Sequence, residues 1–376
     1  MIAVFTVAAL VTVYIYFGYP LLIFVLARLR PRPIARADVT PSMTLLIPAY
    51  NEEATIERKI RNALALDYPK GQLEILIVAD GCTDATCEIV RRHDVRLLEI
   101  PRGGKANALN RGAAEATGDI LVMTDANVEL APDALRVLAR AFADPQVGGV
   151  SGRKQAIVRK GADTTEVGEN LYWRWDQWQK TLESAIGSIF AADGTLYAIR
   201  RSLYVPIDDP AQADDIAISA RVVLQGYRLV LDPDAVAYED APVEGADEFR
   251  RKVRVTNHSV RALLNLGGAL WTSGFYSVEL LSHKLVRHLI PFFLIALLAA
   301  SAWLARTSHL FGLTLALQAL FYLLAVAGAL LRHSRGGALK LLSVPYYFCL
   351  VNAAALLGVL SIARGTRVRA WSPRGT

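Results

Sequence analysis

The two ends of the chain are strongly apolar, and this restricts what it can fold into. Residues 1–27 contain no charged side chain and no histidine, and this length exceeds the roughly 20 residues that a helix needs to cross a bilayer. Three further stretches without Asp, Glu, Lys or Arg are also long enough to cross: 288–305, 310–331 and 341–363. We therefore predict a multi-pass membrane protein.

Charges beside these stretches indicate how the chain is oriented. Arg28, Arg30 and Arg32 follow the first stretch, whereas a secretory signal peptide has its positive charge before the apolar core. We therefore expect a retained anchor in the inner (plasma) membrane. Its C-terminal end should face the cytoplasm. The expected order is an anchor at 1–27, a cytoplasmic domain at 38–260, interfacial amphipathic helices at 261–287, transmembrane helices at 288–363 and a basic tail at 364–376.

The tail creates a conflict in this topology. Its arginines favour the cytoplasmic side, whereas three full spans after a cytoplasmic domain place it outside. Both conditions hold only if one segment does not cross, or if residues 266–287 add a span.

Charge and cysteine content limit the partners. The net charge of +6 suits an anionic lipid surface better than nucleic acid, because the chain has no dense basic tract with interleaved aromatic residues. The three cysteines, Cys82, Cys87 and Cys349, have no metal-binding spacing and form no evident disulfide framework, as expected in a reducing cytoplasm. We therefore expect a lipid bilayer, and no nucleic acid, as partner.

The central segment alternates between strand-like and helix-like patterns. Apolar runs predict strands, and the segments between them predict helices, so we expect an α/β fold with a mostly parallel sheet covered on both faces. Beyond residue 150 the sequence predicts helices at 169–183, 214–225 and 247–265, and a short hairpin at 227–238 around Asp232-Pro233-Asp234. The expected strands are 43–49, 73–79, 95–100 and 120–124, and the first helices are 52–65, 84–92, 105–116 and 132–143.

Two carboxylates follow directly after buried strands of this pattern. Open α/β sheets bind ligands beyond the carboxyl ends of their strands. Asp80 can accept a hydrogen bond from a nucleotide base there. Asp125 and Asn127 place two oxygen ligands on one side of an extended segment, which suits a divalent ion bridging a diphosphate. A strand-end turn is the alternative.

Three further motifs suggest ligand chemistry. Gly103-Gly104-Lys105 puts a cation at a helix start, and this arrangement suits the binding of a phosphate. The alternative is that the segment is only a flexible turn. Asp214-Asp215 stands directly before an apolar-periodic helix. The pair either caps this helix or supplies a general base. The basic run 250–254 is a lipid-headgroup contact or a clamp on a leaving diphosphate.

Taken in order, these segments resemble the membrane-bound family-2 inverting glycosyltransferases, the group with cellulose-, hyaluronan- and poly-N-acetylglucosamine-synthase-like enzymes, over residues 44–260. The resemblance implies a Rossmann-like GT-A domain at 38–260, a nucleotide-sugar donor, UDP-linked by preference, and Mg²⁺ or Mn²⁺. It also implies site residues: Ala49, Tyr50, Glu52 and Asp80 at the nucleoside, Lys105, Arg251 and Arg254 at the phosphates, Asp125 and Asn127 at the metal, Asp215 as base, and Asp193 and Gly194 at the acceptor.

The chain departs from the family pattern at three places. Asn127 replaces the second metal-binding aspartate, which removes one negative ligand. Arg251 replaces the glutamine and Val255 the tryptophan of the Gln-x-x-Arg-Trp motif, which puts processive synthesis in question.

These departures leave three functions open. The first is sugar transfer to a glycan acceptor in extracellular or capsular polysaccharide synthesis, with polysaccharide-export partners. The second is transfer of one sugar to a polyprenyl phosphate or another lipid-linked acceptor. The third is a catalytically degenerate membrane scaffold.

Overall fold

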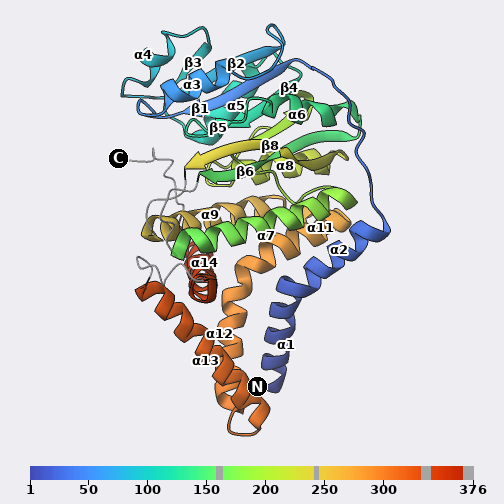
Figure 1. Cartoon of the computed structure of the whole chain (residues 1–376), viewed down its shortest axis with the longest axis vertical. Helices are drawn as coiled ribbons and strands as arrows, with labels where there is room; N and C mark the ends of the chain where they lie inside the picture. Colours follow the sequence, from blue (N-terminus) through green and yellow to red (C-terminus); the bar gives the residue numbers. More distant parts are fainter. Residues whose placement is uncertain (158–163, 241–244, 332–339, 367–376) are drawn as a thin grey trace. The chain divides into compact units, whose positions relative to one another are not determined.

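The computed structural model describes residues 1–157, 164–240, 245–331 and 340–366 (Figure 1). Most of the predicted basic tail, residues 367–376, lies outside the described residues, as does the loop 332–339. The described chain divides into two compact units. An α/β unit holds residues 30–157 and 180–240, and a helical unit holds 1–29, 164–179 and 245–366.

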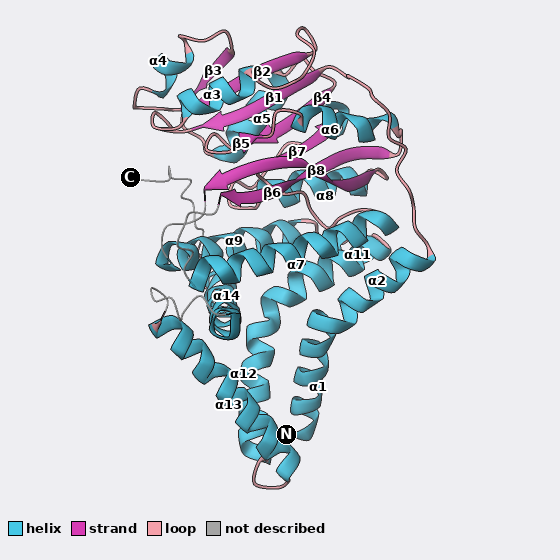
Figure 2. Ribbon diagram, viewed as in Figure 1, coloured by secondary structure: helices cyan, strands magenta, loops and turns pink. Residues whose placement is uncertain are grey.

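The α/β unit is built on an eight-stranded mixed sheet with the order β3-β2-β1-β4-β7-β6-β8-β5 (Figure 2). Strands β1 to β4 pair in parallel, β7 runs antiparallel between β4 and β6, and β8 pairs in parallel with β6 and antiparallel with β5. The predicted α/β fold with a mostly parallel sheet is therefore confirmed. The strands are β1 Met43–Ala49, β2 Leu73–Asp80, β3 Arg96–Ile100, β4 Ile120–Thr124, β5 Glu129–Leu130, β6 Val147–Ile157, β7 Leu196–Arg200 and β8 Arg228–Asp240.

Helices cover both faces of this sheet. Because successive side chains of a strand point to opposite faces, Leu45 and Ile47 of β1 join one apolar core while Leu46 joins the other. Helices α3 (Ile56–Leu64), α4 (Thr86–Val90) and α6 (Ala134–Arg140) pack into the first core. Helices α5 (Lys105–Glu115) and α8 (Asp214–Leu224) pack into the second.

One edge of the sheet collects segments that are far apart in sequence. The parallel register places Ala49 of β1 beside Ala79 of β2, and β4 ends at the same edge. The antiparallel β7 begins there, since Thr124 pairs with Leu196. The turns after β1, β2 and β4 and the turn before β7 therefore meet, as expected for a ligand site in an open α/β sheet.

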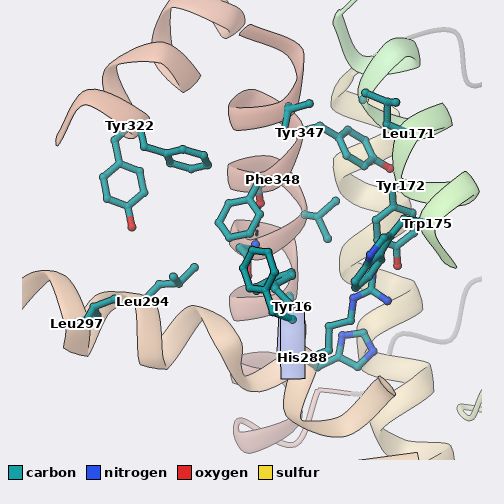
Figure 3. Close-up of a pocket in the computed structure, with 18 of the residues that line it drawn as sticks. Tyr16, Leu171, Tyr172, Trp175, His288, Leu294, Leu297, Tyr322, Tyr347 and Phe348 are labelled. Atoms are coloured by element: carbon teal, nitrogen blue, oxygen red, sulfur yellow. Dashed lines mark hydrogen bonds between the residues drawn. The ribbon is translucent and has the colours of Figure 1, made fainter. Parts of the chain in front are cut away.

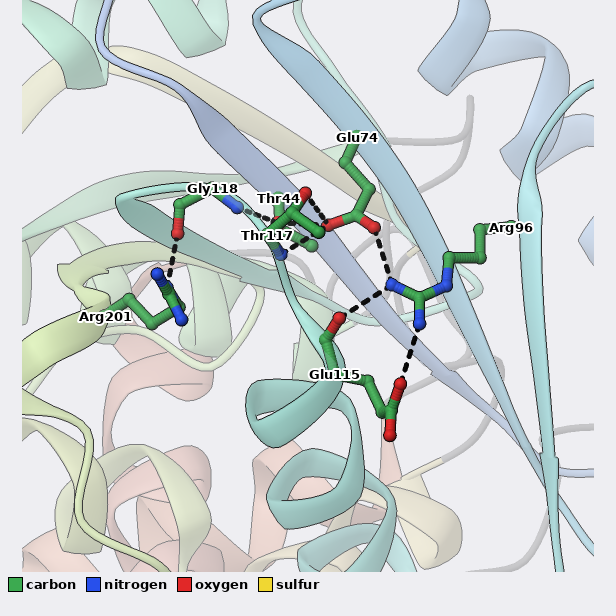
Figure 4. A network of polar contacts seen from close by, with 7 residues as sticks. All are labelled: Thr44, Glu74, Arg96, Glu115, Thr117, Gly118 and Arg201. Carbon is green, nitrogen blue, oxygen red and sulfur yellow. Dashed lines mark hydrogen bonds and ion pairs between the residues drawn. The ribbon is translucent and has the colours of Figure 1, made fainter.

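The opposite edge is closed by a polar network around Glu74 (Figure 4). The Glu74 carboxylate accepts hydrogen bonds from Thr44 Oγ1 at 2.6 Å, from the Thr117 amide at 2.9 Å and from Arg96 at 2.9 Å. Arg96 also binds the Glu115 carboxylate at 2.8 Å. Burial alone would raise the pKa of Glu74, but these donors outweigh it and lower the pKa below its usual value. The network joins the starts of β1, β2 and β3 to the end of α5.

The predicted hairpin at 227–238 is wrong, because β8 is one continuous strand. Its register against β6 shifts between Ser151 and Arg153, so the Asp232-Pro233-Asp234 segment forms a bulge and the strand then continues. The fully buried Asp232 carboxylate accepts two hydrogen bonds from Arg140, at 2.8 and 2.7 Å, which fix the bulge to α6. The sequence analysis also did not predict β5, β6 and β7.

The helical unit contains long apolar helices. By length and composition, four helices among the described residues could cross a membrane: Ile2–Leu29, Phe275–Leu304, His309–Leu330 and Leu341–Ala363. The second begins at Phe275, earlier than the predicted start at residue 288, so part of the predicted interfacial segment continues into this helix. The elements are α1 Ile2–Val13, a π-helical turn Tyr14–Gly18, α2 Tyr19–Leu29, α7 Thr164–Ile186, α9 Gly245–Asn265, α10 Ala269–Thr272, α11 Phe275–Glu279, a π-helical segment Leu280–Leu285, α12 Val286–Leu304, α13 His309–Leu330 and α14 Lys340–Ala363.

Candidate active site

A lysine joins two of the predicted site carboxylates. Lys105, the first residue of α5, places Nζ 2.8 Å from Asp125 Oδ1 and 3.1 Å from Asp214 Oδ2. The three side chains are 22 to 33% exposed, so solvent or a ligand can reach them. Burial alone would lower the pKa of Lys105, but the two carboxylates outweigh it and raise the pKa above its ordinary value. Lys105 is therefore a permanent cation at this edge of the sheet.

The loop before Lys105 is held by Asp80, the last residue of β2. The Asp80 carboxylate accepts a hydrogen bond from the amide of Gly103 and one from the amide of Gly104, each at 2.7 Å, and pairs with Arg102. Gly104 has φ +90°, a conformation that favours glycine. Asp80 is fully buried. In this structure its oxygens therefore bind the loop that presents Lys105, and its predicted contact with a nucleoside stays a prediction.

The turn after β1 interlocks with the turn after β2. Asn51, with φ +51°, accepts a hydrogen bond from the Thr83 amide at 2.9 Å. The Glu52 amide donates to Thr86 Oγ1 at 2.8 Å. The Arg102 guanidinium lies 3.4 Å from the centre of the Tyr50 ring, which brings the Lys105 loop to the same place. The structure thus gathers the predicted nucleoside residues Tyr50, Glu52 and Asp80, while Ala49 is buried at the end of β1.

The predicted acceptor residues lie beside the predicted base. A Cβ atom on Gly194 would lie 3.5 Å from Asp215 Oδ2, which is van der Waals contact, so the two residues are neighbours. The preceding Asp193 is buried, and its Oδ1 accepts hydrogen bonds from the amide and hydroxyl of Thr195. Its Oδ2 has no hydrogen-bond partner among the described residues. Asp215 and Asp193-Gly194 therefore form one wall of the site.

The sequence analysis missed two buried polar residues next to these carboxylates. Lys59 of α3 donates from Nζ to Thr124 Oγ1 at 3.1 Å and to the Val128 carbonyl at 2.6 Å. Tyr197 of β7 is fully buried, and its hydroxyl has no hydrogen-bond partner within the described part of the chain. Burial raises the pKa of Tyr197 well above its ordinary value, and the negative charge of Asp214 is the next largest cause. The phenol therefore stays protonated and can donate a hydrogen bond. Neither residue belongs to a recognisable motif, and only the folded sheet brings them to the site.

The two predicted phosphate arginines lie on α9, in the helical unit. Arg251 donates to Glu169 Oε1 at 2.5 Å and to the fully buried Glu248 Oε2 at 2.7 Å. Its guanidinium is thus neutralised by two carboxylates of its own unit. The roles of Arg251 and Arg254 at a diphosphate stay predictions.

Residues 44–205, which supply most of this site, match the family model described as Glycosyl transferase family 2. The chain carries a family-2 glycosyltransferase domain. Among solved structures, it is similar to the mannosyltransferase PcManGT from Pyrobaculum calidifontis, in complex with GDP-Man and Mn²⁺. The TM-score is 0.72 at 26% identity, over 95% of this chain and 98% of that one. The α/β unit therefore has the predicted GT-A fold.

Curated relatives of the transferase domain are bacterial. The poly-beta-1,6-N-acetyl-D-glucosamine synthase of Staphylococcus aureus (strain COL) is 29% identical over 235 residues, 60% of this chain and 56% of that protein. The probable glycosyltransferase YdaM of Bacillus subtilis (strain 168) is 31% identical over 235 residues, 57% of this chain and 54% of that protein. The chain thus spans about half the length of these curated relatives.

The transferase domain offers a divalent ion few protein ligands. Asp125 supplies a carboxylate, and Asn127 follows two residues later on a half-buried turn closed by the Val128 amide and the Asp125 carbonyl at 3.3 Å. Within the described ranges, His, Cys, Asp and Glu side chains form no group of three or more that could hold a metal. Hard oxygen donors in this small number fit Mg²⁺ or Mn²⁺, which take their remaining ligands from phosphate and water.

Proposed function

We propose that this protein is a membrane-bound inverting glycosyltransferase that moves a sugar from a nucleotide sugar to an acceptor hydroxyl. The observation that carries the proposal is the meeting of Lys105, Asp125 and Asp214, with Asp215 beside Gly194, at the ligand-binding edge of the sheet. The family-2 domain supports the reaction class, and the four long apolar helices support membrane attachment.

The phosphates of the donor would bind beside Lys105. Asp125, with Asn127, would hold the divalent ion, which when bound neutralises charge that develops on the leaving nucleoside diphosphate. Lys105 adds a fixed positive charge at a helix start, stabilised by the two carboxylates it now contacts. The roles of Arg254 and Arg251 at this diphosphate are proposed from the family resemblance alone, because Arg251 is paired with Glu169 and Glu248 within the helical unit. Tyr50, Glu52 and Asp80 would surround the nucleoside.

Asp215 is proposed as the general base. Asp214 is engaged by Lys105, whereas Asp215 Oδ2 faces Gly194 on the acceptor wall. Asp215 would accept the proton of the acceptor hydroxyl while the hydroxyl oxygen attacks the anomeric carbon opposite the departing diphosphate. One displacement of this kind inverts the anomeric centre.

The donor and acceptor are proposed from the relatives. The solved neighbour holds GDP-Man with Mn²⁺, and a curated relative is a poly-N-acetylglucosamine synthase, so the proposed donor is a nucleoside-diphosphate hexose or N-acetylhexosamine. The preference for a UDP-linked donor is proposed from the sequence resemblance. The proposed acceptor is a growing glycan of an extracellular polysaccharide. The catalytic unit would be attached to the inner membrane and would face the cytoplasm, because nucleotide sugars are made in the cytoplasm.

The first test is to mutate the proposed base. Full-length protein in detergent, given a panel of UDP- and GDP-sugars with Mn²⁺, should consume at least one donor. Asp215→Asn should keep donor affinity and lose transfer by about two to four orders of magnitude, because the acceptor proton then has no base. Asp208→Asn is a matched control, since Asp208 belongs to the same unit and its side chain is 87% exposed. Normal turnover by Asp215→Asn removes Asp215 from this role, and a panel without any consumed donor overturns the proposal.

The second test addresses the metal. Asp125→Ala should abolish the Mn²⁺ dependence of donor binding in a calorimetric titration, because Asn127 alone gives the ion no negative ligand. An unchanged Mn²⁺ titration would place the ion elsewhere.

A further inference from the structure

The helical unit contains a cavity that the proposed sugar transfer does not use. Its volume is about 700 Å³, within the range of small-molecule sites in proteins. Residues of the π-helical turn Tyr14–Gly18 and of α7, α12, α13 and α14 line it (Figure 3). Three of these helices, and the turn within Ile2–Leu29, belong to candidate membrane spans.

The cavity has an apolar side and a polar side. Figure 3 shows Leu294, Leu297 and Tyr322 on one side, and Tyr172, Trp175 and His288 on the other. This division matches an amphiphile, with a hydrocarbon chain at the leucines and a polar head at the opposite wall.

The polar side is positively charged. Arg287 and Asp176 lie there, and Lys284 also lines the cavity. The Arg287 guanidinium lies 4.6 Å from the ring centre of Tyr172 and 4.6 Å from that of Trp175, and 3.5 Å from Asp176 Oδ1. Ionisable side chains are rare inside membrane segments and are usually kept there for a ligand or a transport path. The Arg287 guanidinium keeps its charge at any physiological pH, and it favours an anionic head group.

Two buried polar atoms of the lining have no hydrogen-bond partner among the described residues. They are His288 Nε2 and Gln318 Oε1. The other end of each side chain is held, His288 Nδ1 by Thr256 Oγ1 at 3.5 Å and Gln318 Nε2 by Ser301 Oγ at 2.8 Å. A buried polar atom without a partner costs free energy, so these fixed side chains are poised to bind polar atoms of a ligand.

We propose that this cavity binds a phosphate-headed lipid, with its phosphate at Arg287 and His288 and its hydrocarbon chain along Leu294 and Leu297. A sugar chain fits less well, because its hydroxyls would meet leucine side chains that offer no hydrogen bonds. A polyprenyl phosphate and a bilayer phospholipid share the required chemistry, and the test below separates them. The proposal holds whether or not the chain transfers sugar.

The test measures lipid binding to the full-length protein without a sugar donor. The delipidated protein in detergent is titrated with a polyprenyl phosphate, phosphatidylglycerol, diacylglycerol and a hexosamine pentasaccharide, and bound species are counted by native mass spectrometry. At least one phosphate lipid should bind about tenfold or more tightly than diacylglycerol, because only it carries a charge for Arg287. The tighter of the two phosphate lipids identifies the source. Equal binding of diacylglycerol, or binding of the pentasaccharide in place of lipid, overturns the proposal.

Variants locate the site. Leu297→Trp fills the apolar side and should weaken phosphate-lipid binding about tenfold or more. Ile295→Trp is the matched control on the same helix, because Ile295 is 55% exposed and does not line the cavity, and it should bind as wild type does. Unchanged binding by Leu297→Trp overturns the assignment.

A second variant tests the head group. Arg287→Gln should remove the preference for phosphate lipid over diacylglycerol, because it removes the cation that the phosphate would bind. Donor binding by each variant shows that it has folded, so a failed sugar-transfer assay and a failed lipid-binding assay are separate results. If Arg287→Gln keeps the preference for phosphate lipid, the phosphate does not bind at this wall.

Discussion

Lys59 links the interior of the α/β unit to the turn Asp125-Ala126-Asn127, where we propose that a divalent ion binds. It is 1% exposed, and it donates to Thr124 and Val128, the residues on either side of Asp125-Ala126-Asn127. A flexible turn would hold two oxygen ligands poorly, whereas a buried ammonium that binds both flanks fixes their spacing. Asp125 and Glu129 offset part of the free energy needed to bury this charge, because their negative charges favour the protonated form of Lys59.

This arrangement predicts a pH-dependent stability. Burial lowers the pKa of Lys59 from 10.5 to about 7, against the opposing pull of the nearby carboxylates. Between these values the unfolded chain binds a proton that the folded chain lacks, so stability from this residue rises with pH. From pH 7 to 9 the wild type should gain about 2 kcal/mol in unfolding free energy relative to Lys59→Met.

Unfolding in detergent, followed by tryptophan fluorescence for both proteins at each pH, measures this difference. Comparing the two proteins cancels the other titrating groups. A difference that stays constant from pH 7 to 9 would mean that Lys59 keeps its proton throughout.

At the scale of elements, the loop between β3 and α5 depends on Asp80. This carboxylate binds Arg102 and two loop amides, and α5 then starts at Lys105. Asp80→Asn should loosen the loop, because charge-assisted hydrogen bonds worth about 1.5–3 kcal/mol each are weakened. Trypsin should then cleave after Arg102 faster in the nucleotide-free protein.

Asp84→Asn is the control, since Asp84 holds the neighbouring turn by accepting from the Glu53 amide and from the Thr86 amide, each at 3.0 Å. If Asp80 acts only at the nucleoside, cleavage after Arg102 stays at the wild-type rate in Asp80→Asn.

The elements that the sequence predicted well are those with strong local patterns. Strands β1, β2 and β4 are largely buried apolar runs, and β3 is a shorter, partly exposed one. Their alternation with helices predicted the parallel half of the sheet. The antiparallel half was missed because β6 contains Gly148, Gly149 and Gly152, which weaken a strand pattern. In β8, Asp232-Pro233-Asp234 is a strong turn signal, but its buried ion pair with Arg140 makes a bulge favourable. Such long-range pairings cannot be read locally.

The candidate site shows the same limit. Asp125, Lys105 and Asp215 each stand at a strand end or a helix start, so their placement at one edge could be expected from the pattern. The engagement of Asp214 by Lys105 and the proximity of Gly194 to Asp215 depend on β7 entering the sheet beside β4. That pairing joins residues more than 70 positions apart.

At the scale of the whole molecule, the helical unit presents apolar surface that water would not tolerate. On α13 alone, leucines at 310, 313, 317, 320 and 323 are 54 to 67% exposed. Soluble monomers rarely expose contiguous apolar area of this extent, whereas a bilayer covers it with hydrocarbon. The four candidate spans together supply more apolar length than an interfacial helix needs.

The full chain should therefore behave as an integral membrane protein. After cell lysis and an alkaline carbonate wash, it should stay in the membrane pellet and enter solution only with detergent. The wash releases proteins that are held at the membrane surface by charge, but not helices that lie in the hydrocarbon layer. Leu320→Arg, in the middle of His309–Leu330, should reduce membrane insertion, since an arginine at a helix centre costs about 2.5–3.5 kcal/mol. Leu310→Arg is the matched control, because a long side chain near a helix end can reach the interface. Release of the wild-type chain by carbonate would show that these helices lie on the bilayer and do not cross it.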